Sequence, residues 1–262
     1  MPNPRSLRAP VGDGAELAVQ RRGVGPALLL LPGQANSHDW WTGLREAFEN
    51  SYTTITFDYR GTGDTRAVED ASWSTTSFAN DAVRVLDACG VERAHVYGTS
   101  MGGRVAQMLA AGHPERVDRL VLACTSPGGC GAAERSQGVR QVLSQPDPAA
   151  RRKALLELMY TPAWVTRRLT SHLLGDASMS ARARALHLRV SSGHDATELL
   201  PRITAPTLIL HGDADQMAPV ANAHFLHQHV PGSQLHLTAR GRHGFFDEFR
   251  VDIAERIFGF LR

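Results

Sequence analysis

The chain has 262 residues, of which 42% are apolar and 21% are charged, and its formal net charge is +2. This composition indicates an ordinary globular protein of one domain, or of one domain with a large insertion. The small net charge gives no support for binding to nucleic acid, and no apolar run is long enough to span a membrane. The first ten residues lack the apolar core of a signal peptide. Cys89, Cys124 and Cys130 show no C-x-x-C spacing, so we expect free thiols in a reduced, cytoplasmic protein.

The first half of the chain alternates between predicted strands and predicted helices. Short runs rich in β-branched and other apolar residues predict strands over residues 16–20, 27–31, 53–57, 94–97 and 117–124. Helix-prone segments between them cover residues 40–49, 77–89 and 104–111. Strands that alternate with helices are typical of a parallel sheet that is covered on both faces.

The alternation stops between residues 127 and 200, where the pattern is helical. Helices are expected there over residues 139–143, 149–160, 163–174 and 180–190. Strands over 207–210 and 234–238 and helices over 222–228 and 247–261 then resume the earlier rhythm. We therefore predict an α/β fold, with a mostly parallel central sheet in residues 1–126 and 201–262 and an inserted helical cap in residues 127–200. The alternative is that the inserted helices only add packing.

The segment Gly98-Thr99-Ser100-Met101-Gly102 follows a predicted strand and precedes a predicted helix. This G-x-S-x-G pattern, in that context, is typical of a nucleophile elbow, a tight turn that pushes the serine hydroxyl outward. The two glycines allow the strand and the helix to approach closely. We therefore expect Ser100 to be a catalytic nucleophile, against the alternative of a chance match to a short pattern.

A serine nucleophile needs a base, and the base needs a group that orients it. Asp215 follows the strand expected over 207–210, and His243 follows the last predicted strand in a glycine-flanked loop. Ser100, Asp215 and His243 occur in the order serine, acid, histidine, which is expected for an elbow of this kind. Asp213 competes for the role of the acid, but Asp215 lies farther along the turn, so we favour it and expect Asp213 to cap the turn.

Other histidines are expected to be structural. His224, His227 and His229 lie near one helix, but no carboxylate or cysteine accompanies them at the spacing of metal ligands. We expect a solvated helix face there, no metal and no cofactor. His211, at the end of a predicted strand, is also interpreted as structural.

Acyl transfer also requires donors for the negative oxygen that develops in the transition state. The backbone amide of Met101, directly after the nucleophile, is one expected donor. The second is expected from the loop after the strand over 27–31. We assign it to Gln34, because Gly33 lets the chain turn and present the next amide.

Taken together, these segments resemble the α/β-hydrolase superfamily over nearly the whole chain. The matching segments are LPGQ at 31–34, DYRGTG at 58–63, GTSMGG at 98–103, HGDAD at 211–215 and GRHG at 241–244. Within the superfamily, the chain is most similar to small capped enzymes grouped with 3-oxoadipate enol-lactonases and related esterases. Pro32 stands where a histidine is common in the oxyanion loop. The nucleophile is a serine, so the resemblance does not extend to the chemistry of haloalkane dehalogenases or epoxide hydrolases.

The resemblance and the residues together predict a serine hydrolase that cleaves a small carboxylic ester or lactone through an acyl-enzyme on Ser100. The expected partner is this small substrate, with neither nucleic acid nor membrane, and the protein is expected to be a monomer or a homodimer. Aromatic and apolar side chains are candidates for substrate contact, namely Trp40, Trp41, Met159, Tyr160 and Trp164. The alternative for these side chains is that they belong to the core of the cap.

Two other functions remain open from the sequence. A thioesterase, a perhydrolase or a C–C bond hydrolase would use the same three residues on a different bond. A ligand-binding or receptor protein could also use this scaffold without turnover, because a fold does not by itself specify a function.

Overall fold

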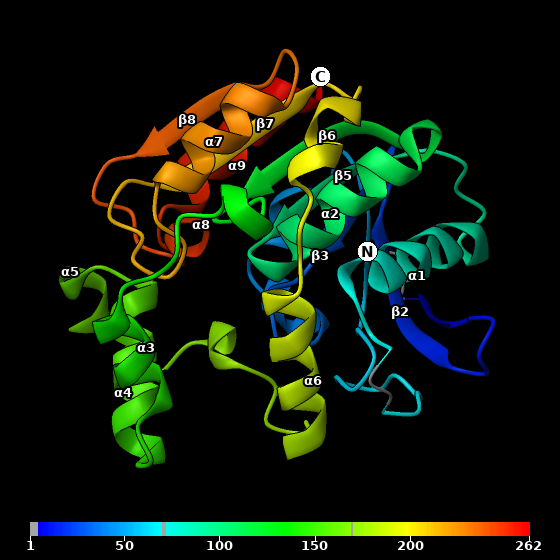
Figure 1. The fold of residues 1–262 in the computed structure, drawn as a ribbon. Helices are drawn as coiled ribbons and strands as arrows, with labels where there is room; N and C mark the ends of the chain where they lie inside the picture. Colours follow the sequence, from blue (N-terminus) through cyan, green and yellow to red (C-terminus); the bar gives the residue numbers. More distant parts are fainter. Residues whose placement is uncertain (1–4, 70–71, 169) are drawn as a thin grey trace.

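The computed structural model describes residues 5–69, 72–168 and 170–262 (Figure 1). Residues 1–4, from the segment in which we expect no signal peptide, lie outside this described part, as do residues 70–71. Leu169, from the helix expected over 163–174, lies outside it too. Within the described ranges, no helix is both long and apolar enough to cross a membrane.

The strands of the described chain form one eight-stranded sheet in the order β1-β2-β4-β3-β5-β6-β7-β8. Strands β3 to β8 run parallel, whereas β1 and β2 run antiparallel to their neighbours. The strands are β1 (Arg5–Pro10), β2 (Glu16–Gly23), β3 (Ala27–Leu31), β4 (Thr53–Phe57), β5 (Ala94–Thr99), β6 (Val117–Ala123), β7 (Thr207–Gly212) and β8 (Gln234–Thr238). This is the predicted α/β architecture. The sequence does not predict β1, because its run of Arg, Ser and Pro lacks β-branched and aromatic residues.

Helices cover both faces of the sheet (Figure 1). Leu29 and Leu31 of β3 pack into the cluster on one face, and Leu28 and Leu30 pack into the cluster on the other. This split follows from the two-residue period of a strand that is buried on both sides. The first face is covered by α1 (Thr75–Ala88), α2 (Met101–Gly112) and α7 (Ala221–His229). The second is covered by the 3₁₀ turns η1 (His38–Trp41) and η2 (Arg45–Ala47) and by α8 (Phe245–Glu248) and α9 (Arg250–Leu261).

The segment between β6 and β7 is helical, and its helices α3 to α6 lie at one end of the molecule, from which the chain after α6 returns along the sheet (Figure 1). Its elements are η4 (Gly129–Gly131), α3 (Gln137–Ser144), α4 (Pro148–Met159), α5 (Pro162–Val165), η5 (His172–Leu174), α6 (Ala181–Ser192) and η6 (Thr197–Arg202). Ser136, Asp147 and Ser180 begin α3, α4 and α6, where each side chain accepts a hydrogen bond from the first turn. We call this part of the chain the inserted segment (residues 127–200).

Three expected helices are interrupted in the structure. The segment 40–49 forms η1 and η2, because Gly43 between them has a φ of +79°, which ends a right-handed helix. The segment 163–174 forms only α5 and η5. Its β-branched residues Val165, Thr166 and Thr170 lower its helix propensity. The last helix is also divided, into α8 and α9.

Candidate active site

Ser100 lies on a sharp turn between β5 and α2 and has a φ of +53°, in the left-handed region. A Cβ atom added to Gly98 would lie 2.3 Å from the carbonyl oxygen of Gly102, and one added to Gly102 would lie 2.1 Å from that of Leu31. Only glycine therefore fits at these two positions without a shift of the backbone. The turn is held by Thr125, whose hydroxyl donates to the Ser100 carbonyl over 2.8 Å.

The structure brings Ser100, His243 and Asp215 into one chain of contacts. His243 Nε2 lies 3.0 Å from Ser100 Oγ, and His243 Nδ1 lies 2.7 Å from Asp215 Oδ2. A carboxylate beside Nδ1 favours the tautomer that carries its proton there, which leaves Nε2 free to accept the serine proton. Three segments that follow β5, β7 and β8 meet in this way at the carboxyl edge of the parallel strands.

Asp215 is fully buried and accepts several hydrogen bonds. Its Oδ1 accepts from the amides of Met217 and Ala218, at 2.8 and 2.9 Å. Burial by itself would raise the pKa of Asp215, but the charge of His243 and hydrogen bonds from His211 and His243 outweigh it, so that the pKa lies below its usual range. Asp215 is therefore ionised at neutral pH.

Asp213, the competing aspartate, has a different place. Its Oδ1 accepts from the backbone amide of Arg240 over 2.6 Å, which ties the loop after β7 to the loop after β8. Arg240 has a φ of +60°, and this contact holds it in that conformation. The structure thus places Asp213 at a turn and Asp215 beside the histidine.

The two expected oxyanion donors lie on neighbouring segments. Met101 is the first residue of α2, and the close packing of Gly102 against the carbonyl groups of Leu31 and Pro32 brings the loop after β3 beside it. Among the described residues, the amides of Met101 and Gln34 have no hydrogen-bond acceptor. Both are therefore free to donate to a bound group.

The inserted segment holds the loop that carries His243. The amides of His243 and Gly244 donate to the carbonyl groups of Leu158 and Met159 at the end of α4, at 3.3 and 2.7 Å. The Tyr160 hydroxyl donates to Asp247 Oδ2 over 2.8 Å. The position of His243 thus depends on residues about 85 positions earlier in the chain.

Most of the side chains expected to contact substrate are packed inside the protein. Trp41 is fully buried against Tyr97, with ring centroids 5.0 Å apart. Trp40 is buried over Gly33, and its Nε1 donates to Thr99 Oγ1 over 2.8 Å. Met159, Tyr160 and Trp164 lie at the end of α4 and in α5, where Tyr160 is fully buried and stacks on the half-buried Trp164 at 3.6 Å. The four buried side chains therefore support the two loops of the site, and only Trp164 among the five keeps part of its surface exposed.

The histidines of α7 and the cysteines Cys89 and Cys130 lie outside this cluster, whereas His211 Nε2 lies 3.5 Å from Asp215 Oδ2 and 2.7 Å from the Ala218 carbonyl oxygen. In and after α7, His227 Nδ1 contacts Ser233 Oγ at 3.0 Å, and His229 Nδ1 donates to the Phe225 carbonyl at 2.8 Å. The three cysteines, Cys89, Cys124 and Cys130, are unpaired. Over the described part of the chain, no three His, Cys, Asp or Glu side chains gather as a metal site would require.

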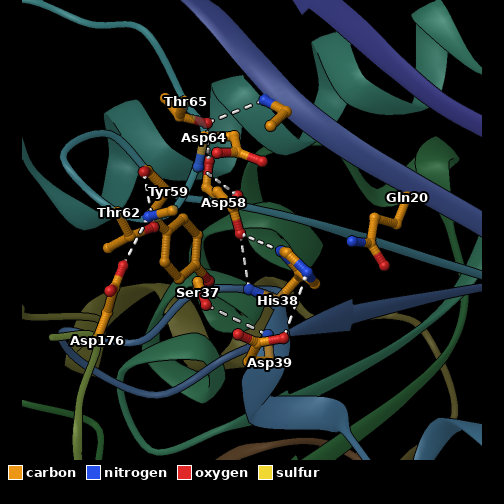
Figure 2. Close-up of polar contacts among 12 residues, drawn as sticks. Gln20, Ser37, His38, Asp39, Asp58, Tyr59, Thr62, Asp64, Thr65 and Asp176 are labelled. Atoms are coloured by element: carbon orange, nitrogen blue, oxygen red, sulfur yellow. Dashed lines mark hydrogen bonds and ion pairs between the residues drawn. The ribbon is translucent and has the colours of Figure 1, made fainter. Parts of the chain in front are cut away.

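A polar network at the end of β4 holds the far side of the loop after β3 (Figure 2). Asp58 Oδ1 accepts from the backbone amide and from Nδ1 of His38, at 2.7 and 2.8 Å, and its Oδ2 accepts from the Asp64 amide at 2.9 Å. The buried carboxylate of Asp58 raises the pKa of His38, although burial opposes this. No local pattern in the sequence predicts this network, although Asp58 begins one of the segments that carry the family resemblance.

The arrangement of the sheet and of the three contacting residues can be compared with known proteins. The family model for the alpha/beta hydrolase fold matches residues 26–249. The chain belongs to the α/β-hydrolase family. It is thus a hydrolase that acts on small molecules, as the sequence predicts.

Members of this family with similar sequences include two named hydrolases. Serine hydrolase BPHL of Homo sapiens is 30% identical over 253 residues, which cover 90% of this chain and 81% of that protein. A putative carbamate hydrolase, RutD, of Azorhizobium caulinodans is 30% identical over 241 residues, which cover 89% of this chain and 90% of that protein. The enol-lactonase of Burkholderia xenovorans has a similar structure, with a TM-score of 0.82 over 95% of this chain and 97% of the other, but at 20% identity this likeness shows the fold alone.

Proposed function

We propose that this α/β-hydrolase is a serine hydrolase that cleaves a small carboxylic ester or lactone through an acyl-enzyme on Ser100. The observation that carries the proposal is the continuous contact from Ser100 Oγ through His243 to the buried Asp215, at 3.0 and 2.7 Å. The elbow geometry at Gly98 and Gly102 supports it, because it holds the serine at the edge of the sheet.

In the proposed reaction, Ser100 Oγ attacks the substrate carbonyl while His243 Nε2 takes its proton. Asp215 stays ionised, orients the imidazole and stabilises the imidazolium that forms. The amides of Met101 and Gln34 donate to the oxyanion of the tetrahedral intermediate. His243 then gives the proton to the departing alkoxide. A water molecule, deprotonated by His243, hydrolyses the acyl-enzyme and regenerates Ser100.

We also infer that the inserted segment (residues 127–200) acts as a cap over this site. Its supporting contacts are those of α4 with the His243 loop and of the region after η5 with the loop after β3. Both of these loops carry part of the proposed machinery, His243 in the first and Gln34 in the second. Trp164, as the half-buried member of the five aromatic and apolar candidates, is the one with surface left for substrate.

The central test is replacement of the nucleophile, with a matched serine as the control. Ser233 also contacts a histidine, His227 at 3.0 Å, but among the residues that the structure describes no carboxylate pairs with that ring. We expect Ser100→Ala to lose at least about 10³-fold in kcat on p-nitrophenyl acetate, and Ser233→Ala to keep its activity. Full esterase activity in Ser100→Ala would refute the proposed mechanism.

The bond that is cleaved needs a separate test, since the same three residues serve several reactions. A panel of a simple ester, a lactone, a thioester and a carbamate compares these classes, the carbamate being included because of the similarity to RutD. We expect the ester or the lactone to have the highest kcat/KM. Labelling of Ser100 by a phosphonate without turnover of any of the four would favour a ligand-binding protein instead.

A further inference from the structure

His187 of α6 reaches out of the inserted segment and contacts the loop after β3. Its ring is completely buried, with Nδ1 3.2 Å from the amide nitrogen of Ala35 and Nε2 2.8 Å from the carbonyl oxygen of Arg60. The Ala35 amide can only donate and the Arg60 carbonyl can only accept. Nδ1 is therefore the acceptor and Nε2 carries the proton, so the ring is neutral and its tautomer is defined.

The surroundings of His187 keep it neutral. Burial lowers the pKa of His187, and the hydrogen bond to the Arg60 carbonyl only partly opposes this. The neighbouring rings are Tyr59, Trp73 and Phe78, which surround the imidazole at centroid distances of 5.5 to 6.3 Å. No ion pair involves His187 within the described ranges, so no charge near the ring requires a protonated form.

Ala35 has an unusual backbone that the inserted segment holds at both polar groups. Its φ is +58°, which is unfavourable for a residue with a side chain. Its amide donates to His187, and its carbonyl accepts from the Asp176 amide over 2.7 Å. The loop is further held by Asn36, whose Oδ1 accepts from the Gly175 amide at 3.1 Å and whose Nδ2 donates to the Gln34 carbonyl at 2.8 Å.

These contacts define one peptide plane next to the expected oxyanion donor. The peptide between Gln34 and Ala35 has its carbonyl bound by Asn36 and its amide bound by His187. Because consecutive peptide planes are linked only through φ and ψ, fixing this plane restricts the direction of the Gln34 amide on the preceding plane. The far side of the loop is held independently by the core, through the His38–Asp58 contacts (Figure 2).

We propose that His187 is a positioning residue that sets the Gln34 amide for oxyanion binding, so that the oxyanion site is complete only when α6 is docked on the core. The inference rests on the proposed function of the site. It assigns to the inserted segment a part in the chemistry, in addition to enclosing substrate. A leucine or phenylalanine at this position would leave the Ala35 amide and the Arg60 carbonyl without this partner, which a buried imidazole supplies to both.

The test compares three variants of two buried histidines in the same segment. His187→Leu removes the acceptor, and His187→Asn replaces it, because the Asn oxygen can take the place of Nδ1. The control is His194→Leu, since His194 is equally buried but contacts Thr75 at 3.0 Å and not the loop after β3. The measurements are kcat and KM on p-nitrophenyl acetate, the melting temperature, and the hydrogen exchange of the peptide that contains residues 33–37.

We expect His187→Leu to lower kcat by about 10- to 100-fold relative to His194→Leu at similar melting temperatures. KM should change by less than about threefold, because the amide acts mainly in the transition state. Exchange within 33–37 should accelerate in His187→Leu alone, and His187→Asn should recover at least about tenfold of the lost kcat. Equal kcat in the two leucine variants, a loss confined to KM, or a His187→Asn variant as impaired as His187→Leu would overturn the proposal.

Failure of the proposed function would give a different result. If Ser100→Ala retained full activity, the serine mechanism would be wrong and kcat would carry no information on Gln34. The exchange rate of residues 33–37 would still show whether His187 holds this loop. Unchanged exchange in His187→Leu would by itself refute the positioning role.

Discussion

Acidification should destabilise the protein through His194, a buried histidine at the end of the inserted segment. Its Nδ1 contacts Thr75 Oγ1 at 3.0 Å. Burial and the nearby charge of Arg104 lower the pKa of His194 to about 3, against the weaker opposing effect of Asp195. In the unfolded chain the same ring has a pKa of about 6.5.

The direction of the effect follows from proton uptake. As the pH falls below about 6.5, the unfolded chain binds a proton at His194, whereas the folded protein does not until about pH 3. The free energy of unfolding therefore decreases with falling pH throughout this window and levels off below it. At about pH 5 the loss from this one group amounts to about 1.5 pH units at about 1.4 kcal/mol each, or about 2 kcal/mol.

Urea unfolding of the wild type and of His194→Asn at about pH 7.5 and about pH 5 measures this loss. The Asn oxygen can keep the contact to Thr75 but does not titrate. We expect the wild type to lose about 2 kcal/mol more than the variant between the two pH values, whatever their difference at the higher pH. Equal losses in the two proteins, or a larger loss in the variant, would show that His194 does not stay neutral in the fold.

Three further substitutions test the site and its frame. Gly102→Ala should destabilise the protein by about 1–3 kcal/mol in urea unfolding, because the new Cβ would lie 2.1 Å from a backbone oxygen at the end of β3. An unchanged unfolding midpoint would contradict the close approach of α2 to the end of β3. Asp215→Asn should reduce kcat by about 10⁴-fold in an ester assay. Its matched control, Asp213→Asn, should keep kcat within about twofold, because Asp213 only ties a turn. A large loss of kcat in Asp213→Asn and a small one in Asp215→Asn would exchange the roles of the two aspartates. Asp81→Ala should cost about 2 kcal/mol by chemical denaturation, since it removes contacts of 2.6 and 2.8 Å to the buried Arg60 and leaves it, among the described residues, only the ion pair with the exposed Asp13. A loss below about 1 kcal/mol would mean that the Arg60–Asp81 pair is dispensable.

Much of the central sheet could be predicted because its signals are local. Leu28 to Leu31 form a continuous apolar run, and such a run predicts a strand that is buried on both faces. Helix starts were also readable, as at Ser180, whose side chain caps α6. The apolar spacing of segment 40–49 predicts one helix, whereas the structure has two 3₁₀ turns separated by Gly43, which has a φ of +79°.

The surroundings of the large aromatic side chains could not be predicted. Trp41 and Tyr160 follow spacings that suit a pocket wall as well as a core. Their burial depends on which elements cover them, and those elements come from distant parts of the chain, such as Phe246 beside Trp41 and Asp247 beside Tyr160. The sequence therefore predicts candidates for substrate contact without indicating which of them face substrate.

The sequence by itself determined strands β2 to β8, the helices α1, α2 and α7 that cover one face of the sheet, and the elbow that carries Ser100. These features depend on the periodicity of apolar residues and on glycines at a few positions, which act over short stretches of backbone. Only the tertiary structure brought His243 within 3.0 Å of Ser100 and His187 within 3.2 Å of Ala35, across 143 and 152 positions of the chain. Such contacts depend on how the inserted segment docks on the sheet edge, and no local pattern encodes the docking of two surfaces that are this far apart in sequence.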